Sequence, residues 1–462
     1  MSISPFAIVL ILIYIRIFFM NSIKKQFIWS FVLTMICSLT IYMGYFISFS
    51  TTIYYPFSIV ALLLNTWFSF RLSKSNLKRN MDSEKLKKGI LIYVLSCFVT
   101  ILLFYTNRYQ YPVILNSDYE NFLLNQVGYT YLTNSSIKYG LFITSCLNLY
   151  NIYIAVRYLN IGDIINIGNL FLKISFVALV VGYIEFFTEQ LFHSLFITDF
   201  TIWLMGKSGA QQHSLDLRDG WTAIQGFTRE ASMYSTFVFY ASIIALILAK
   251  NKSTSFLKVF ICLAFGLLVL NRSMSSYVYA FILISIIVYL NPFRLKHLDE
   301  RNPKFALGLL VTIVLFLLTQ SLAISEDSYL GQRLSSSLSE FTNFQSSSFT
   351  YSSEGIRYLS ISQGLDAYFK RPFFGIGFGC VSSLSGVVAL LSSIGTIGTL
   401  SFFNIFRLIV KKYKKEAFLM VIFFIFLPNL LINDYQTMLA MVIPFIFVLL
   451  SVLYRNINPV YK

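Results

Sequence analysis

The sequence predicts an all-α polytopic membrane protein with about 12–13 transmembrane helices and two large loops on the outer face. Composition and hydropathy support this fold class. Of the 462 residues, 56% are hydrophobic and 12% are charged, whereas a soluble protein carries about 25% charged residues. The mean hydropathy is +0.70, and at about 20 apolar residues per span the chain can fill about a dozen spans. Soluble enzymes, disordered scaffolds and disulfide-stapled secreted domains are therefore excluded.

Hydropathy and loop charge divide the chain into about thirteen expected spans within one integral membrane domain, residues 1–462. Most have no long polar interruption, so each backbone N–H can bond within its own helix, as lipid requires. The expected spans lie near 5–20, 28–48, 52–70, 89–106, 138–156, 167–188, 231–249, 255–270, 274–291, 305–323, 384–408, 416–433 and 436–454.

The charges predict how the spans are oriented. One set of alternate loops, taken with the C-terminus, carries 24 Lys and Arg against 6 Asp and Glu, and the opposite set carries 10 against 13. Because cytoplasmic loops are enriched in Lys and Arg, we expect the first set inside, with the N-terminus outside and the C-terminus inside. The net charge of +16 is then a topology signal, and we expect no nucleic-acid partner.

The long loops all fall on the predicted outer face. They are 107–137, the outer loop 189–229 and the large outer loop 324–372, which has 49 residues. The large loop ends in an amphipathic stretch that we expect to lie flat at the membrane interface. Loops longer than about 15 residues are usually functional, so we expect any chemistry on the outer side.

A first group of charged residues lies where the loop 189–229 enters the expected span 231–249. Arg229 and Glu230 adjoin there, within GWTAIQGFTREASMYSTF at 220–237. A charged pair at the mouth of a span is costly to desolvate and is therefore a functional candidate. The alternative is a local ion pair that anchors the helix. The polar residues just before the pair are His213, Asp216, Arg218 and Asp219.

Two further segments complete the candidate set. LNRSMSSYVYAF at 270–281 is a tight outer hairpin in which Arg272 is the basic residue, and its serines can supply hydroxyl donors; an arginine in a plain polar turn is the alternative. The other segment is SSEGIRYLSISQGLDAYFKRPFFGIGFG at 352–379. We expect its helical stretch to hold Arg357 toward a cavity, whereas for Arg371 a snorkelling anchor is favoured over a binding role. The remaining candidates there are Glu354, Gly375 and Gly377.

Three charges fall inside expected spans: Arg16, Lys173 and Glu185. Lys173 and Glu185 lie about 18 Å apart along one helix and cannot pair directly. Glu185 is near the outer end and can reach the same region as Glu230. No His or Cys spacing fits a metal ion and no phosphate-binding loop appears, so we expect no metal and no cofactor.

The outer arginines suggest what is bound. The guanidinium group suits bidentate binding of phosphate oxygens, and no nucleotide is expected on this side of the membrane. Arginines gathered at the outer membrane surface therefore point to a lipid phosphate or pyrophosphate.

Three stretches in order resemble the bacterial O-antigen polymerase (Wzy-type) and O-antigen ligase superfamily. GFTREASMYSTF is similar to the Gly-Phe-x-x-Glu-Ala/Pro-Ser stretch that opens a span in the polymerases, with Glu230 at the acidic position. LNRSMSSY resembles their Ser/Arg outer hairpin. GIRYLSISQGLDAYFKRPFFGIGFG, followed by SSIGTIGTLSFF at 392–403, resembles their Arg, helix, Pro-x-x-Gly-Ile-Gly-x-Gly and Gly-x-x-Gly series. The resemblance covers residues 218–403.

The resemblance implies a multi-pass protein of the bacterial inner (cytoplasmic) membrane whose active side is periplasmic. It implies that undecaprenyl-pyrophosphate-linked glycans serve as donor and acceptor, with membrane lipid and a chain-length regulator as further partners. Ligases carry a His between the two glycine motifs, but here that interval reads CVSSLSGVVALLSSI. We therefore expect a polymerase. The alternatives are an O-antigen ligase and a flippase of the lipid-linked unit, although charges gathered in outer loops argue against transport.

The expected chemistry assigns roles to these residues. Fixed cations stabilise the leaving pyrophosphate, and a carboxylate or His accepts the proton of the attacking hydroxyl. We expect Arg229 and Arg357 to act on the pyrophosphate and Glu230 to be the base or to orient the acceptor. Further substrate-binding residues would be Arg218, Arg272, Arg371, Glu354, His213, Gly375 and Gly377, with Glu354 and His213 as alternative bases.

Overall fold

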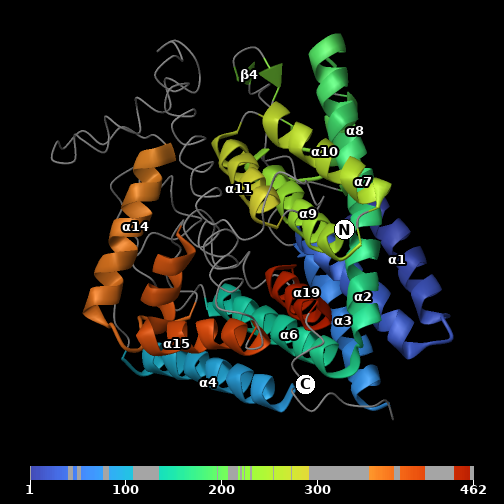
Figure 1. The fold of residues 1–462 in the computed structure, drawn as a ribbon. Coiled ribbons are helices and arrows are strands. Elements are labelled where there is room, and N and C mark those ends of the chain that lie inside the picture. The colour runs from blue at the N-terminus through green and yellow to red at the C-terminus, as the bar shows by residue number, and fades with distance from the viewer. Residues whose placement is uncertain are drawn as a thin grey trace. The chain divides into compact units, whose positions relative to one another are not determined.

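The computed structural model describes residues 2–39, 45–48, 54–75, 83–107, 135–194, 196–205, 217–218, 221–222, 224–228, 231–252, 254–271, 273–290, 353–378, 385–410 and 442–457. These residues are nearly all helical, with a few strands of two to four residues (Figure 1). Within them, three helices are long and apolar enough to cross a membrane: Ser83–Leu103, Ile161–Phe192 and Gly386–Val410. Several shorter apolar helices accompany them.

The chain divides into two compact units that alternate along the sequence. Unit 1 comprises Met1–Asn76, Leu159–Ser335 and Arg455–Lys462, and unit 2 comprises Leu77–Tyr158 and Ser336–Tyr454.

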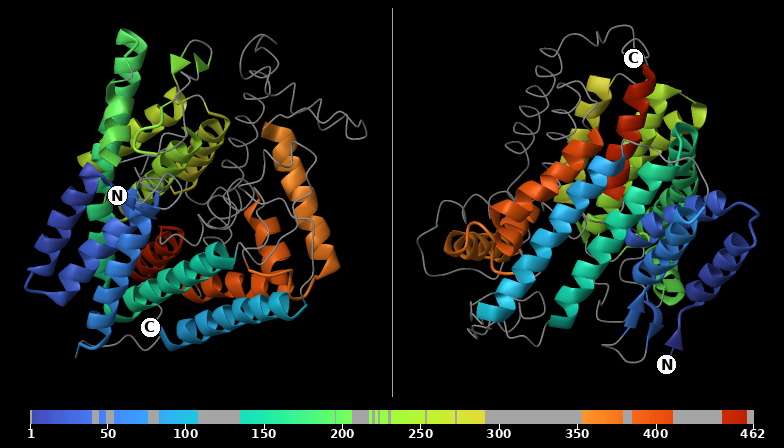
Figure 2. Two further views of the ribbon diagram at one scale, coloured as in Figure 1. Left: turned by 180° about the vertical axis from the view of Figure 1, so that it is seen from behind. Right: turned by 90° about the horizontal axis from the view of Figure 1, so that it is seen from below.

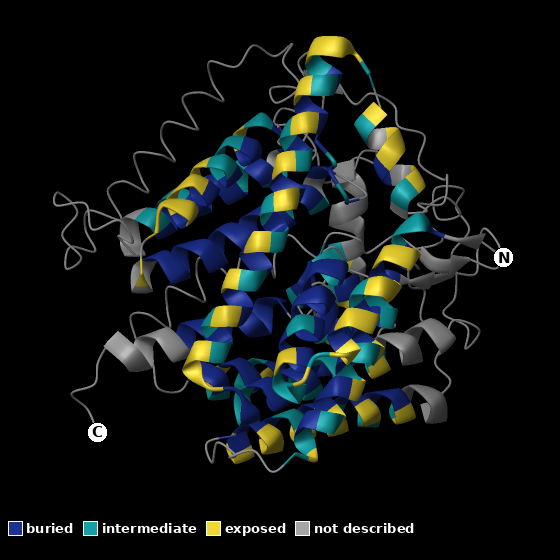
Figure 3. Ribbon diagram, turned by 90° about the vertical axis from the view of Figure 1, so that its right-hand side faces the viewer, coloured by how far each residue is buried: buried dark blue, intermediate teal, exposed yellow. Residues whose placement is uncertain are grey.

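Unit 1 is built from two groups of helices joined by one long helix. In the first group α2 packs against α3, and in the second α9 packs against α10 and α11 (Figure 1); the long helix α7 contacts both α2 and α9. Figure 3 shows that α7 has exposed residues along one side and buried residues along the other. The helices are α1 (Pro5–Phe18), α2 (Ile23–Leu39), α3 (Phe57–Ser73), α7 (Ile161–Phe192), α8 (Phe196–Met205), α9 (Ala231–Asn251), α10 (Ser255–Leu270) and α11 (Met274–Leu290).

A small sheet replaces the helix ends that we expected in spans 28–48 and 52–70. Helix α2 ends at Leu39, and strands β2 (Tyr45–Ser48) and β3 (Tyr54–Pro56) pair antiparallel, with β1 (Ser2–Ile3) on the other edge of β2. Aromatic and β-branched residues favour strands, and proline favours the edge of a sheet and the start of a helix. The two spans are therefore shorter than we expected.

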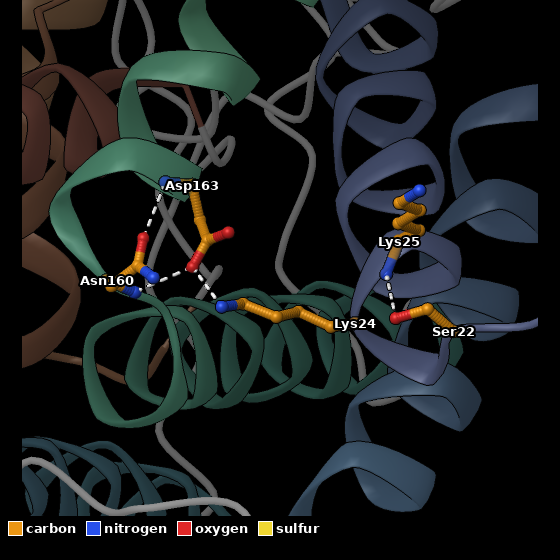
Figure 4. A network of polar contacts seen from close by, with 5 residues as sticks. All are labelled: Ser22, Lys24, Lys25, Asn160 and Asp163. Atoms are coloured by element: carbon orange, nitrogen blue, oxygen red, sulfur yellow. Dashed lines mark hydrogen bonds and ion pairs between the residues drawn. The ribbon is translucent and has the colours of Figure 1, made fainter.

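Polar contacts join the end of α1, the start of α2 and the start of α7. The Lys24 ammonium at the start of α2 forms an ion pair with Asp163 in the first turn of α7. Asp163 also completes a capping box, in which it accepts the Asn160 N–H at 2.8 Å and donates its own N–H to Asn160 Oδ1 at 2.9 Å (Figure 4). Nearby, Gln26 Nε2 donates to the carbonyl of Phe18 at 2.8 Å. These contacts hold the end of α1 and the starts of α2 and α7 together.

Unit 2 holds α4 (Ser83–Asn107), α6 (Ser135–Tyr158), α14 (Ser353–Lys370), α15 (Gly386–Val410) and most of α19 (Val442–Ile457). Helix α4 lies beside α6 and α15 (Figure 2). Arg157 at the end of α6 pairs with Glu84 at the start of α4 at 3.3 Å, so these two helices run antiparallel. The rings of Tyr93 and Phe402 meet at 5.7 Å between α4 and α15.

Apart from strands β2 and β3, helices occupy most of the described part of each expected span; spans 305–323 and 416–433 lie outside the described residues. Two ion pairs join helix ends in a way that agrees with the predicted alternation of the spans, in which successive spans cross the membrane in opposite directions. Lys24 meets Asp163, and Arg157 meets Glu84, at ends that the charge pattern assigns to one side. The amphipathic stretch after Glu354 is helical, as expected, and forms α14. Helix α8, inside the loop 189–229, was not expected.

Candidate functional site

A tight turn precedes the start of α9. Thr228 donates its backbone N–H at 3.0 Å and its hydroxyl at 2.7 Å to the carbonyl of Gln225. Gly226 has a φ of +54°, a conformation that glycine adopts without strain. Arg229 and Glu230, which follow this turn, lie outside the described residues.

The carboxylate of Glu185 binds this turn to α7. It accepts the backbone N–H of Gln225 at 3.0 Å and that of Gly226 at 2.6 Å, one on each oxygen. The Glu185 residue is 1% exposed. A buried carboxylate is very costly unless hydrogen bonds replace its lost hydration, and here backbone amides do so. Glu185 therefore lies against the segment just before Glu230, near the place that we expected it to reach.

Tyr234 fills the space between the turn and α7. Its hydroxyl donates to the carbonyl of Ala178 at 2.9 Å, and the residue is 1% exposed. A Cβ atom on Gly226 would lie 2.5 Å from the Tyr234 ring, and one on Gly182 would meet the Tyr234 hydroxyl. The two glycines thus leave room for one aromatic side chain, which packs α9 onto α7.

The serine hairpin joins the first turn of α9 from the other side. Asn271, directly after α10, donates its side-chain N–H₂ to the carbonyl of Ala231 at 2.8 Å and to Ser235 Oγ at 2.7 Å. The hydroxyls of Ser235 and Ser273 are 3.1 Å apart. Ser273 also accepts the N–H of Ser276 at 3.1 Å and so caps α11. Arg272 itself lies outside the described residues.

These contacts bring the first two candidate segments together. Ala231 follows Glu230 directly in the sequence, and Asn271 directly precedes Arg272. We call this set of hydrogen-bonded residues the α9 junction; it consists of Glu185, Gln225, Gly226, Thr228, Ala231, Tyr234, Ser235, Asn271 and Ser273.

Two buried acceptors at the α9 junction remain unused. Gln225 Oε1 and Asn271 Oδ1 are buried, and within the part of the chain that the structure describes neither has a hydrogen-bond partner. Most buried polar atoms in proteins have a partner, so these two oxygens are acceptors that a further donor would satisfy.

The third candidate segment belongs to unit 2. Glu354 and Arg357 lie in the first turns of α14, with side chains outside the described residues. Arg371 follows α14 and is partly buried. In the last turn, Lys370 pairs with Asp366 at 2.5 Å on an exposed surface.

The glycines of this segment serve a backbone contact with α15. Gly375 donates its N–H to the Arg371 carbonyl at 2.9 Å, and Gly377 donates to the Ser393 carbonyl at 3.0 Å. A Cβ on Gly375 would lie 2.6 Å from the carbonyl oxygen of Ser392, which explains why glycine is needed. Both amides are thus hydrogen bonded within the protein, and substrate binding by these glycines stays a prediction.

Some of the remaining candidates lie within the described residues and others lie outside them. Arg218 is in strand β4 (Leu217–Arg218), opposite Trp221 of β5 (Trp221–Thr222). Arg16 and Lys173 are exposed on α1 and α7. The candidates His213, Asp216 and Asp219 lie outside the described residues.

Neither the importance of Asn271 nor the partners of Glu185 were predicted from the sequence. An acid inside the apolar expected span 167–188 was a usable signal for Glu185. Asn271 carried a weaker one, a polar residue with a side-chain donor at a helix–helix junction. Neither a protein-family model nor any curated protein matches the chain.

Proposed function

We propose that this chain is a multi-pass protein of the bacterial inner membrane that joins undecaprenyl-pyrophosphate-linked repeat units into a surface polysaccharide on the periplasmic side. The observation that carries the proposal is the α9 junction. Two of the three polymerase-like segments meet there through the bond from Asn271 to the Ala231 carbonyl, at 2.8 Å. A functional site built from these segments needs them at one end of the helices, and the junction supplies that.

The apolar helices support a membrane location. Three helices are long and apolar enough to span a bilayer, and several shorter apolar helices accompany them; a lipid-linked substrate requires access from the membrane. Large apolar side chains are exposed on α7, such as Val177, Ile184 and Phe187. Such surfaces are unfavourable in water but suit lipid chains.

The chemistry needs two kinds of group. As an acceptor hydroxyl attacks the anomeric carbon, a new C–O bond forms, the bond to pyrophosphate breaks, and the hydroxyl proton passes to a base. We assign the stabilisation of the leaving pyrophosphate to Arg229 and Arg357, and proton acceptance or acceptor orientation to Glu230. The unused acceptors Gln225 Oε1 and Asn271 Oδ1 suit a ligand rich in hydroxyl groups.

Deletion of the gene, followed by electrophoresis of the surface polysaccharide, tests the proposal. For a polymerase, the ladder collapses to a core carrying one repeat unit. Core alone with accumulated lipid-linked polymer would indicate the ligase instead, and loss of lipid-linked units from the outer leaflet would indicate the flippase.

Complementation with Arg357→Ala tests the assigned role. Removing one stabilising donor typically lowers the rate about 100-fold or more, so we expect normal protein abundance and single repeat units. Lys370→Ala, on the exposed last turn of the same helix, serves as the control and should restore the ladder. Normal long chains from Arg357→Ala would contradict the assignment.

A further inference from the structure

We propose that Glu185 and Asn271 are positioning residues, which fix the two segments flanking Arg229 and Glu230. The inference rests on the proposed function, because it gives these two residues a role in that reaction. Neither residue needs to contact substrate. Each would act through the charged pair that its hydrogen bonds flank.

Glu185 fixes the segment before the pair. Its two carboxylate oxygens each accept one backbone N–H, from Gln225 at 3.0 Å and from Gly226 at 2.6 Å. Two bonds from one planar group fix orientation as well as distance. The residue is 1% exposed and lies on α7, so the turn is held to the buried side of a long helix.

Asn271 fixes the segment after the pair. Its side chain donates to the carbonyl of Ala231 at 2.8 Å and to Ser235 Oγ at 2.7 Å. Ser235 is linked in turn to Ser273 at 3.1 Å. The first turn of α9 is therefore held to the start of α11 as well as to the end of α10.

The two anchors lie close together along the chain. Four residues separate Gly226 from Ala231, and two of these are Arg229 and Glu230. Glycosyl transfer depends on accurate placement of charged groups, and a shift of about 1 Å can cost about 100-fold in rate. A segment anchored at both ends suits that demand, which explains why a carboxylate is buried in an apolar helix.

Isosteric substitutions in the full-length protein test the proposal. Glu185→Gln removes one of the two acceptors, and Asn271→Asp removes the donor. Asp163→Asn is the matched control, because it weakens the ion pair and capping box at the other end of α7. Purified variants in proteoliposomes receive the lipid-linked repeat unit extracted from the deletion strain. Hydrogen exchange of residues 224–228 and 231–235 is measured separately, without substrate.

We expect Glu185→Gln to speed exchange at Gln225 and Gly226 and to lower kcat about 100-fold, with KM for the lipid-linked unit near that of the wild type. Asn271→Asp should lower kcat similarly and speed exchange at 231–235. The double variant should lose little more than the worse single variant, because both act through the same pair. Asp163→Asn should leave kcat and exchange at 224–228 near wild-type values.

Three results would overturn the positioning role: unchanged exchange in Glu185→Gln, faster exchange with unchanged kcat, or equal loss of kcat in the Asp163→Asn control. The absence of polymer from the wild-type protein would instead overturn the proposed function, and the positioning role with it. The exchange experiment separates the two failures, because it reports on the anchors without substrate.

Discussion

At the residue scale, the α9 junction depends on groups whose partners are backbone atoms. Glu185 is conspicuous in the sequence as an acid among apolar residues, and its position near the outer end was predictable. Its partners were not, because the N–H groups of Gln225 and Gly226 are present in every residue except proline. The same holds for the bond from Asn271 to the Ala231 carbonyl. The buried charge was therefore predictable from the sequence, but the groups that it binds were not.

Gly226 offers the clearest test at this scale. An added Cβ would lie 2.5 Å from the Tyr234 ring, and the φ of +54° disfavours a side chain. Backbone strain of this kind costs about 1–3 kcal/mol. We expect Gly226→Ala to lower the thermal unfolding midpoint of the purified protein and to weaken polymer formation.

The control for Gly226→Ala is Gly162→Ala in the first turn of α7. A Cβ there would have Asn160 Oδ1 at 3.5 Å as its nearest neighbour, an ordinary contact. Its midpoint should equal or exceed that of the wild type, because alanine favours helices. Equal midpoints in Gly226→Ala and the wild type would show that the turn adopts another conformation.

At the element scale, α15 shows how a helix can break without leaving its backbone groups unpaired. Gly395 has φ +64° and ψ −173°. The N–H groups of Thr396 and Ile397, which an unbroken helix would direct to residues 392 and 393, donate instead to the carbonyls of Pro372 at 2.8 Å and Phe373 at 3.2 Å. Ile376 and Gly377 donate in return to the carbonyls of Ser392 at 2.8 Å and Ser393 at 3.0 Å.

Replacing Gly395 with alanine should break these reciprocal backbone hydrogen bonds. The new Cβ would meet the Phe373 carbonyl and lie 2.5 Å from Phe374 N, and backbone atoms cannot move aside as a flexible side chain can. We expect Gly395→Ala to yield little monodisperse protein, as measured by fluorescence-detected gel filtration. Ser401→Ala, on the helical part beyond the break, is the control; comparable yields from both variants would contradict the arrangement.

The glycines of the third segment were visible in the sequence, and Gly375 and Gly377 were expected to bind substrate. The pairing of 372–377 with 392–397 was not predicted, because it joins segments about twenty residues apart through backbone atoms alone. The sheet β1–β2–β3 was missed for a different reason. Hydropathy assigned Tyr45–Ser48 and Tyr54–Pro56 to helices, since aromatic strands are as apolar as transmembrane helices.

At the scale of the whole molecule, the charge pattern makes a prediction about sidedness. The helix ends near Lys74 and Lys252 should face the cytoplasm and the end near Ser194 should face outward, because Lys and Arg mark cytoplasmic loops. Single cysteines at these positions, in a cysteine-free background, can be probed in spheroplasts with a membrane-impermeant maleimide. We expect labelling at Ser194→Cys alone, and labelling at all three after permeabilisation. The reverse pattern would put the α9 junction on the cytoplasmic side.

The division into two units explains a limit of sequence reasoning at this scale. Local hydropathy locates helices one at a time, whereas the units depend on contacts such as that between Lys24 and Asp163, which are distant in the sequence. The hydropathy profile therefore does not show which helices pack together in a unit.

The alternation of the units also bears on biosynthesis. The ribosome completes α1, α2 and α3 and must then make α4 and α6, which belong to the other unit, before α7 exists. At a synthesis rate of about 5–20 residues per second, Lys24 waits on the order of ten seconds for Asp163. During that interval the first three helices have to persist in the bilayer without their partner, and insertion factors or lipids must cover the surface that α7 later occupies.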